Sequence, residues 1–221
     1  CCTRNCRYCN VRFATPQAVD DGEPDRLVSA VGRLGLNYVV ITSVTRDDLE
    51  DGGAEQFAHC IRRLRETHPA CIVEVLIPDF QGSFPSLWTV IEAAPAVINH
   101  NMEVCRSLFP ELRPEGDYDR SLELLRRVRQ YAPDVPTKSG FMIGLGEEKD
   151  QIIRLMEDLR AVDCQRLTIG QYLQPTRNHW PVHKFYHPDE FADFRQIALD
   201  MKFEAVMAGP LVRSSYHAAG M

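Results

Sequence analysis

Apolar positions along the chain alternate between two spacings, one typical of amphipathic helices and one typical of buried strands. Helix-spaced segments and short continuous apolar runs recur about every 30 to 35 residues, the length of one βαβ unit. Because strands that are apolar on both faces belong to parallel sheets covered by helices, the pattern predicts an α/β fold. The predicted helices span residues 24–34, 54–67, 87–94, 118–131, 151–162 and 188–201, and the predicted strands span 38–44, 71–78, 96–100, 138–145, 166–173 and 204–208.

Polar residues gather directly after several of the predicted strands. Residues 45–48 follow the first strand, Asn101 and Glu103 the third, residues 144–147 the fourth and residues 171–175 the fifth. Right-handed crossovers close a parallel sheet toward a barrel, and barrel sites lie in the loops at the carboxyl ends of the strands. The sequence therefore predicts one site at that end of the sheet, although a single such residue can instead serve a turn.

Composition and charge narrow the class of protein. A length of 221 residues, with 44% hydrophobic and 25% charged residues, fits one globular domain with a sizeable core. The formal net charge of −6 disfavours a general nucleic-acid binder, which needs a positive surface. No apolar stretch approaches the roughly 18 residues of a membrane span, and no signal-like segment opens the chain. We expect a soluble protein of the cytoplasm.

Half of the eight cysteines lie within the first nine residues. A secreted disulfide framework would spread its cysteines, and a structural zinc site needs four ligands, usually in two pairs. Here Cys2, Cys6 and Cys9 form a C-x3-C-x2-C triplet, and Cys1 is off this spacing. Three thiolates leave one iron of a four-iron cluster without a protein ligand, and an open metal position indicates catalysis. The other cysteines, at positions 60, 71, 105 and 164, are expected to be core or incidental thiols.

The triplet, with the aromatic Tyr8 before its last cysteine, resembles the cluster motif of radical S-adenosylmethionine (SAM) enzymes. The resemblance implies that Cys2, Cys6 and Cys9 hold a [4Fe–4S] cluster whose free iron binds the methionine part of SAM. It also implies a partial (β/α)6 TIM-like barrel of the radical SAM type. In that superfamily the cluster loop follows the first barrel strand. Because no residue precedes Cys1, we expect that strand to be missing.

Seven blocks of sequence extend the resemblance to the lipoyl synthase family. That family inserts two sulfur atoms, at the sixth and eighth carbons, into an octanoyl-lysine on a lipoyl carrier domain. Unactivated C–H bonds lie beyond general acid–base catalysis, so this reaction needs a cofactor radical. The blocks are TSVTRDDLEDGG (42–53), PDFQG (78–82), NHNMEV (99–104), RPEGDYDRSL (113–122), TKSGFMIGLGE (137–147), LTIGQYLQPTRNH (167–179) and GPLVRSSYHA (209–218).

The resemblance also implies roles for individual residues. Residues 140–147 (GFMIGLGE) fit the superfamily pattern GxIxGxxE on the strand that supports the adenine of SAM, and Tyr8 is expected beside that adenine. The candidate cofactor contacts are Tyr8, Thr42, Ser43, Asn101, Glu103, Lys138, Gly144, Gly146, Glu147 and Gln171.

The segment Arg213-Ser214-Ser215-Tyr216 resembles the RSSY motif that supplies a serine ligand to the family's second [4Fe–4S] cluster, the sulfur source. Ser215 is the candidate catalytic residue and metal ligand, with Ser214 as the alternative. The family's C-x4-C-x5-C motif, which holds the rest of that cluster, does not occur in these 221 residues. We therefore expect residues 1–221 to form one radical SAM core domain that lacks the N-terminal segment of the auxiliary cluster. Residues 204–221 would be its C-terminal extension.

The implied partners are octanoylated lipoyl carrier domains and an electron donor such as ferredoxin or flavodoxin. The carriers would be the acyltransferase subunit of 2-oxoacid dehydrogenases and the glycine cleavage H protein; neither nucleic acid nor membrane is expected. The location would be the mitochondrial matrix if the source is eukaryotic. Two alternatives stay open: another sulfur-inserting radical enzyme similar to biotin synthase, and an inactive fragment that binds only the radical SAM cluster.

Overall fold

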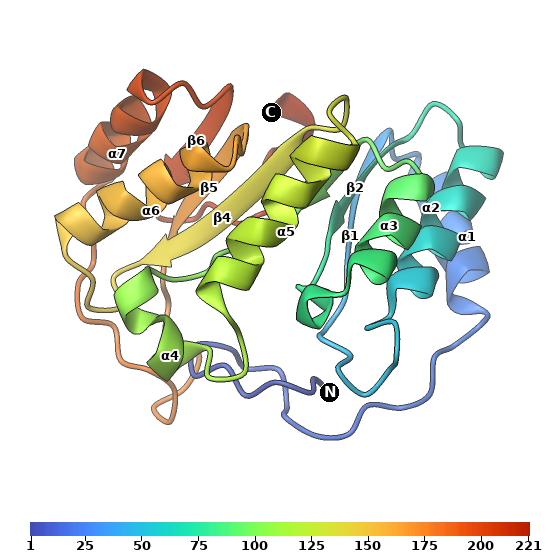
Figure 1. Ribbon diagram of the computed structural model, residues 1–221, viewed down its shortest axis with the longest axis horizontal. Coiled ribbons are helices and arrows are strands. Elements are labelled where there is room, and N and C mark those ends of the chain that lie inside the picture. Colours follow the sequence, from blue (N-terminus) through green and yellow to red (C-terminus); the bar gives the residue numbers. More distant parts are fainter.

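The computed structural model describes all 221 residues and has six parallel strands in one sheet (Figure 1). Neighbours in the sheet follow chain order, and β1 and β6 each pair with a single strand, so the sheet is an open partial barrel. The predicted α/β fold is confirmed. The strands are β1 (Tyr38–Thr42), β2 (Ile72–Leu76), β3 (Val97–Asn99), β4 (Thr137–Ile143), β5 (Arg166–Gln171) and β6 (Ala205–Gly209).

Helices connect successive strands and pack along the sheet (Figure 1). Cys60, in the second of these helices, is buried, and Cys71, Cys105 and Cys164 are buried as well, as expected of core thiols. No helix is both long enough and apolar enough to cross a bilayer. The helices are α1 (Glu23–Leu34), α2 (Ala54–Thr67), α3 (Phe84–Glu92), α4 (Phe109–Leu112), α5 (Tyr118–Tyr131), α6 (Lys149–Ala161) and α7 (Pro188–Asp200).

Capping side chains set the helix boundaries. Asp117 caps α5 by accepting a hydrogen bond from the Arg120 amide at 2.8 Å. Helix α3 begins at Phe84, three residues before its predicted start, because Ser83 caps it and a proline occupies its first turn. A single capping residue predicts where a helix begins less clearly than a long apolar stripe predicts the helix itself.

Residues 1–22 run below the sheet in Figure 1, past the end toward which the arrow of β4 points. They form only an isolated bridge between Cys2 and Phe13, and every strand of the sheet follows them in the sequence. The amide of Arg7 donates to the carbonyl of Leu112 at 3.0 Å, and the amide of Trp180 donates to the carbonyl of Arg7 at 3.0 Å. The cysteine loop thus lies at the carboxyl end of the sheet, where the site was predicted.

Candidate active site

The three predicted cluster ligands share this loop. Cys2, Cys6 and Cys9 are free and partly exposed. The amides of Arg4 and Val11 donate to the sulfurs of Cys2 and Cys9, each at 3.5 Å. Burial raises the pKa of the Cys6 and Cys9 thiols. Metal binding at these positions must therefore displace protons, because the thiolate is the ligand.

The donor set fits an iron–sulfur cluster better than a single ion. No three histidine, cysteine, aspartate or glutamate side chains converge as ligands of one metal ion. A [4Fe–4S] cluster does not require such convergence, because each cysteine binds a different iron. Three free thiols on one loop supply three of the four protein ligands that such clusters usually have.

A buried guanidinium lies beside the cysteine loop. Arg113 is 8% exposed, and its Nη1 donates to the carbonyl of Asn101 at 3.1 Å. Its positive charge acts to lower the pKa of Tyr8, Glu103 and Cys6. Nε of Arg113 and Oδ1 of Asn101 are both buried and have no hydrogen-bond partner. Such atoms are costly to leave unpaired, so one free donor and one free acceptor mark a place where a cofactor with polar groups fits.

Tyr8, Asn101 and Glu103, three of the candidate cofactor contacts, lie near Arg113. Asn101 Nδ2 donates to Glu103 Oε1 at 3.0 Å. Burial raises the pKa of Glu103, while the Arg113 charge and the bond from Asn101 act in the opposite direction. Burial also raises the pKa of Tyr8 well above its usual value. Burial therefore shifts the proton equilibrium of both side chains toward the uncharged form.

The C-terminal serine segment reaches the same cluster of residues through Asn101. Ser214 Oγ accepts from Asn101 Nδ2 at 2.6 Å, and the Ser214 carbonyl accepts from Lys138 Nζ at 2.7 Å. Ser215, the sequence-based candidate, is exposed. The structure therefore joins Ser214, rather than Ser215, to the residues near the cysteine loop.

Lys138 is held by an internal ion pair. Its Nζ lies 3.0 Å from Glu74 Oε1, and both side chains are fully buried. Tyr38 donates its hydroxyl to the other Glu74 oxygen at 2.5 Å. Burial lowers the pKa of Lys138, and the charge and hydrogen bond of Glu74 oppose that effect. The structure thus gives Lys138 a role in holding the C-terminal segment.

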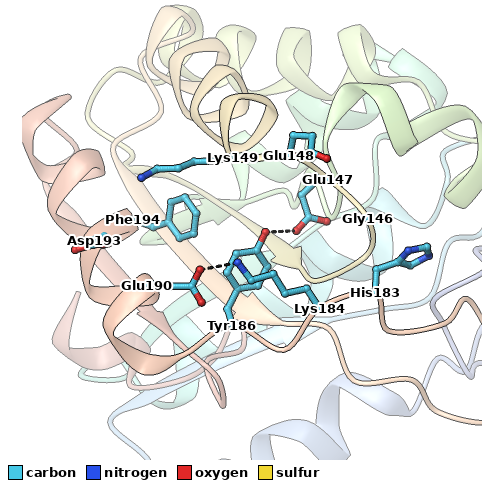
Figure 2. A pocket seen from close by; sticks show the side chains of 10 residues that line it. All are labelled: Gly146, Glu147, Glu148, Lys149, His183, Lys184, Tyr186, Glu190, Asp193 and Phe194. Carbon is cyan, nitrogen blue, oxygen red and sulfur yellow. Dashed lines mark hydrogen bonds and ion pairs between the residues drawn. The ribbon is translucent and has the colours of Figure 1, made fainter.

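The GxIxGxxE loop is braced by its own glutamate. Glu147 accepts from the amides of Gly144 and Leu145 at 2.6 and 2.9 Å. It also accepts from the hydroxyl of Tyr186 at 3.2 Å (Figure 2). Gln171 Nε2 donates to the Lys184 carbonyl at 3.0 Å and so ties the end of β5 to the segment that packs over this loop. The contacts that the structure gives Glu147 and Gln171 therefore stabilise loops.

Two cavities lie away from the three loop cysteines. Gly146 and Glu147 line a polar cavity of about 440 Å³ that also includes Glu190 and Lys184 (Figure 2). A largely apolar cavity of about 780 Å³ lies along β1 and α1 and includes Thr42 and Ser43.

The hydroxyls of Thr42 and Ser43 donate to the carbonyls of Leu76 and Val44 at 3.1 and 2.8 Å. Both side chains are exposed, and neither cavity that they or Gly146 line includes a loop cysteine. Neither cavity therefore joins these candidates to Cys2, Cys6 or Cys9.

Sequence reasoning missed the buried charges of the site. It did not single out Arg4, Arg113 or Glu74, and it gave Asp47 and Asp79 no role of their own. Asp47 and Asp79 carried a usable signal, because each follows a predicted strand closely. For Arg4 the only local signal was a charge between two cluster ligands.

Comparison with known proteins decides the family. A family model described as the radical SAM superfamily matches residues 1–159. The lipoyl synthase of Caldicellulosiruptor bescii is 52% identical over 217 residues, which cover 98% of this chain and 75% of that protein. The lipoyl synthase of Oceanobacillus iheyensis is 51% identical, with 98% of this chain and 69% of that protein covered. The chain belongs to the lipoyl synthase family.

Solved structures share the fold of this chain. Streptococcus suis SuiB bound to S-adenosylmethionine has a TM-score of 0.71 at 12% identity, covering 94% of this chain and 47% of that one. Methylornithine synthase has a TM-score of 0.67 at 12% identity, covering 97% and 70%. As a lipoyl synthase family member of the radical SAM superfamily, the protein is an enzyme whose cofactors include a [4Fe–4S] cluster and SAM.

Proposed function

We propose that this protein inserts sulfur at the sixth and eighth carbons of a protein-bound octanoyl-lysine to form the lipoyl group. The identity to lipoyl synthases over 98% of the chain is the observation that carries the proposal. It favours this reaction over the biotin-synthase-like alternative. The cysteine loop at the carboxyl end of an open barrel supports it, because sites of such folds lie there.

Cys2, Cys6 and Cys9 would hold the radical SAM cluster in this proposal. The cluster and SAM, when bound, supply a radical able to remove hydrogen from an unactivated C–H bond, which no protein side chain can do. Arg113 Nε offers an unpaired donor that suits a carboxylate, and Asn101 Oδ1 offers an unpaired acceptor that suits an ammonium group. Together these two atoms complement the amino-acid part of SAM.

A second, sulfur-donating [4Fe–4S] cluster is proposed for any form of the protein that carries the C-x4-C-x5-C cysteines. Its serine ligand would come from the segment at 213–216. Ser215 is exposed and open to a ligand, and Ser214 already accepts from Asn101. Substituting each serine by alanine and counting iron in such a form distinguishes the two.

The finer partner assignments are also proposals. The octanoyl-lysine would be carried by the acyltransferase subunit of 2-oxoacid dehydrogenases or by the glycine cleavage H protein, and ferredoxin or flavodoxin would deliver electrons. We place the protein in the cytoplasm, or in the mitochondrial matrix of a eukaryote, because thiolate chemistry at Cys2, Cys6 and Cys9 needs a reducing compartment. Localising a tagged copy in the source cell tests the last point.

An isotope experiment tests the proposed reaction. The reconstituted protein is incubated anaerobically with SAM, dithionite and a lipoyl-domain peptide whose octanoyl chain carries deuterium at its sixth and eighth carbons. We expect deuterium to appear in 5′-deoxyadenosine, and this transfer to be lost in Cys6→Ala. The mass of the peptide then reports how many sulfur atoms were added.

Each outcome has a distinct meaning. A gain of two sulfur atoms supports the full reaction. Deuterium transfer without any sulfur gain supports the alternative in which these 221 residues hold only the radical SAM cluster. A parallel incubation replaces the peptide with deuterium-labelled dethiobiotin. Transfer of deuterium from dethiobiotin but not from the octanoyl peptide would contradict the proposal and support the biotin-synthase-like alternative.

A further inference from the structure

Arg4 is the only buried residue among the first 22, although it carries a charge. Its side chain is 2% exposed, and it lies between two of the proposed cluster ligands, Cys2 and Cys6. A buried guanidinium is costly unless carboxylates pair with it and its donors are hydrogen-bonded. Its partners therefore indicate what it does.

Two carboxylates bind the Arg4 guanidinium from two sides. Nε and Nη2 donate to Asp47 at 2.7 and 2.9 Å, and Nη1 and Nη2 donate to Asp79 at 3.0 and 2.5 Å. Burial would raise the pKa of Asp79, but the hydrogen bonds and charge of Arg4 bring it to about 2, so the pair stays ionised at neutral pH. Only the planar fork of arginine can make two such bidentate contacts.

The two carboxylates come from neighbouring strand ends. Asp47 follows β1 and Asp79 follows β2, and these strands pair in parallel. Thr3 extends the attachment, since its hydroxyl donates to the Thr45 carbonyl and accepts from the Asp47 amide, both at 3.0 Å. The cysteine loop is thus fastened to the sheet midway between two of its thiols.

We propose that Arg4 is a positioning residue, whose clamp by Asp47 and Asp79 holds the cysteine loop in its ligating form before the cluster binds. The loop has one isolated bridge and no helix or strand of its own. Without the clamp, cluster binding must also supply the free energy of ordering the loop. The inference rests on the cluster-binding part of the proposed function and not on the octanoyl substrate.

The metal-free protein gives the first test. Arg4→Lys keeps the charge but loses the fork, and Arg7→Lys is a matched control, because Arg7 lies in the same loop with a side chain 54% exposed. Iodoacetamide is added anaerobically, and mass spectrometry follows each cysteine. We expect Cys2, Cys6 and Cys9 of Arg4→Lys to react roughly tenfold faster through local opening of the loop. The buried Cys105 and Cys164 should react at the wild-type rate in both variants.

The reconstituted protein gives the second test. We expect Arg4→Lys to release iron to a chelator about 10- to 100-fold faster than wild type, because replacing a residue that orients metal ligands usually costs a factor of that size in metal affinity. Arg7→Lys should release iron at the wild-type rate. Neither measurement needs an octanoyl substrate, so failure of the sulfur-insertion proposal would leave this result standing.

Fast reaction of Cys105 and Cys164 would reveal that Arg4→Lys fails to fold. In that case a second variant tests the clamp. Asp47→Asn removes one carboxylate at a position with a 22% exposed side chain and leaves the Asp79 pair in place. It should also speed both the reaction of the loop cysteines with iodoacetamide and the release of iron to the chelator. Wild-type thiol reactivity and wild-type iron release in the variants that fold would overturn the proposal.

Discussion

His100 shows how burial sets the charge state of a single residue. Its side chain is surrounded by protein, with Nδ1 2.8 Å from the Ile77 carbonyl and Nε2 3.0 Å from the Ser121 hydroxyl. A carbonyl can only accept, so the geometry assigns the proton of the neutral ring to Nδ1. Burial, and after it the charge of Arg113, lowers the pKa of His100 to about 4. The ring is therefore neutral at pH 7.

This low pKa predicts acid destabilisation. Between pH 6.5 and 4 the unfolded chain binds a proton at His100 that the folded protein does not, so this stability contribution is complete above pH 6.5 and is lost as the pH falls to about 4. The cofactor-free wild type should lose about 2 to 3 kcal/mol more than His100→Gln between pH 7 and 4.5. Urea unfolding at the two pH values measures the difference. Equal losses in the two proteins would show that His100 does not titrate in this way.

Lys138 shows why a residue's role was hard to predict from the sequence. The family resemblance made it a candidate cofactor contact, and the structure pairs it with Glu74 in the core. The partner is 64 residues away along the chain, and both side chains are fully buried. Periodicity reports which positions face inward, but it does not report which buried charges meet. The ion pairs of Arg4 with Asp47 and Asp79 were missed for the same reason.

The loop after β4 depends on two glycines in a backbone conformation that other residues rarely adopt. Gly144 has φ 101° and Gly146 has φ 116°. A Cβ on Gly144 would overlap the Gln171 amide and the Lys184 carbonyl, whereas a Cβ on Gly146 would meet only the His183 ring, at 3.4 Å. Any other residue would therefore be strained at both positions, and only at Gly144 would its side chain also lack space.

Two matched substitutions separate these effects. Gly144→Ala should destabilise the protein by about 1–3 kcal/mol more than Gly146→Ala, which is the usual cost of overpacking. The free energy of unfolding of both variants, measured in urea without cofactor, gives the difference. Equal destabilisation would mean that backbone conformation alone requires glycine at Gly144.

Elements with a long apolar stripe were the ones that the sequence predicted best. The bounds of α2 and α5 match their predicted ranges, because burial of one face dominates their formation. The short helix α4 was missed, since four residues carry no measurable period. Strand β2 is shorter than its apolar run, because apolar character continues past the last paired residue, Leu76.

At the scale of the whole molecule, the candidate site joins segments that lie far apart in the chain. The cysteine loop begins the sequence, Asn101 and Glu103 follow β3, and Ser214 lies near the other terminus. The sequence could place these groups at one end of a parallel sheet, because that rule depends only on topology. It could not show that Arg113 would be buried among them, since that depends on how the loops pack.

The most direct test of the central claim is electron paramagnetic resonance of the anaerobically reconstituted, dithionite-reduced protein, recorded with and without SAM. We expect the signal of a reduced [4Fe–4S] cluster, and we expect SAM to shift it, because three cysteine ligands leave one iron open. A spectrum that SAM leaves unchanged, or a protein that binds zinc instead of iron, would contradict the account.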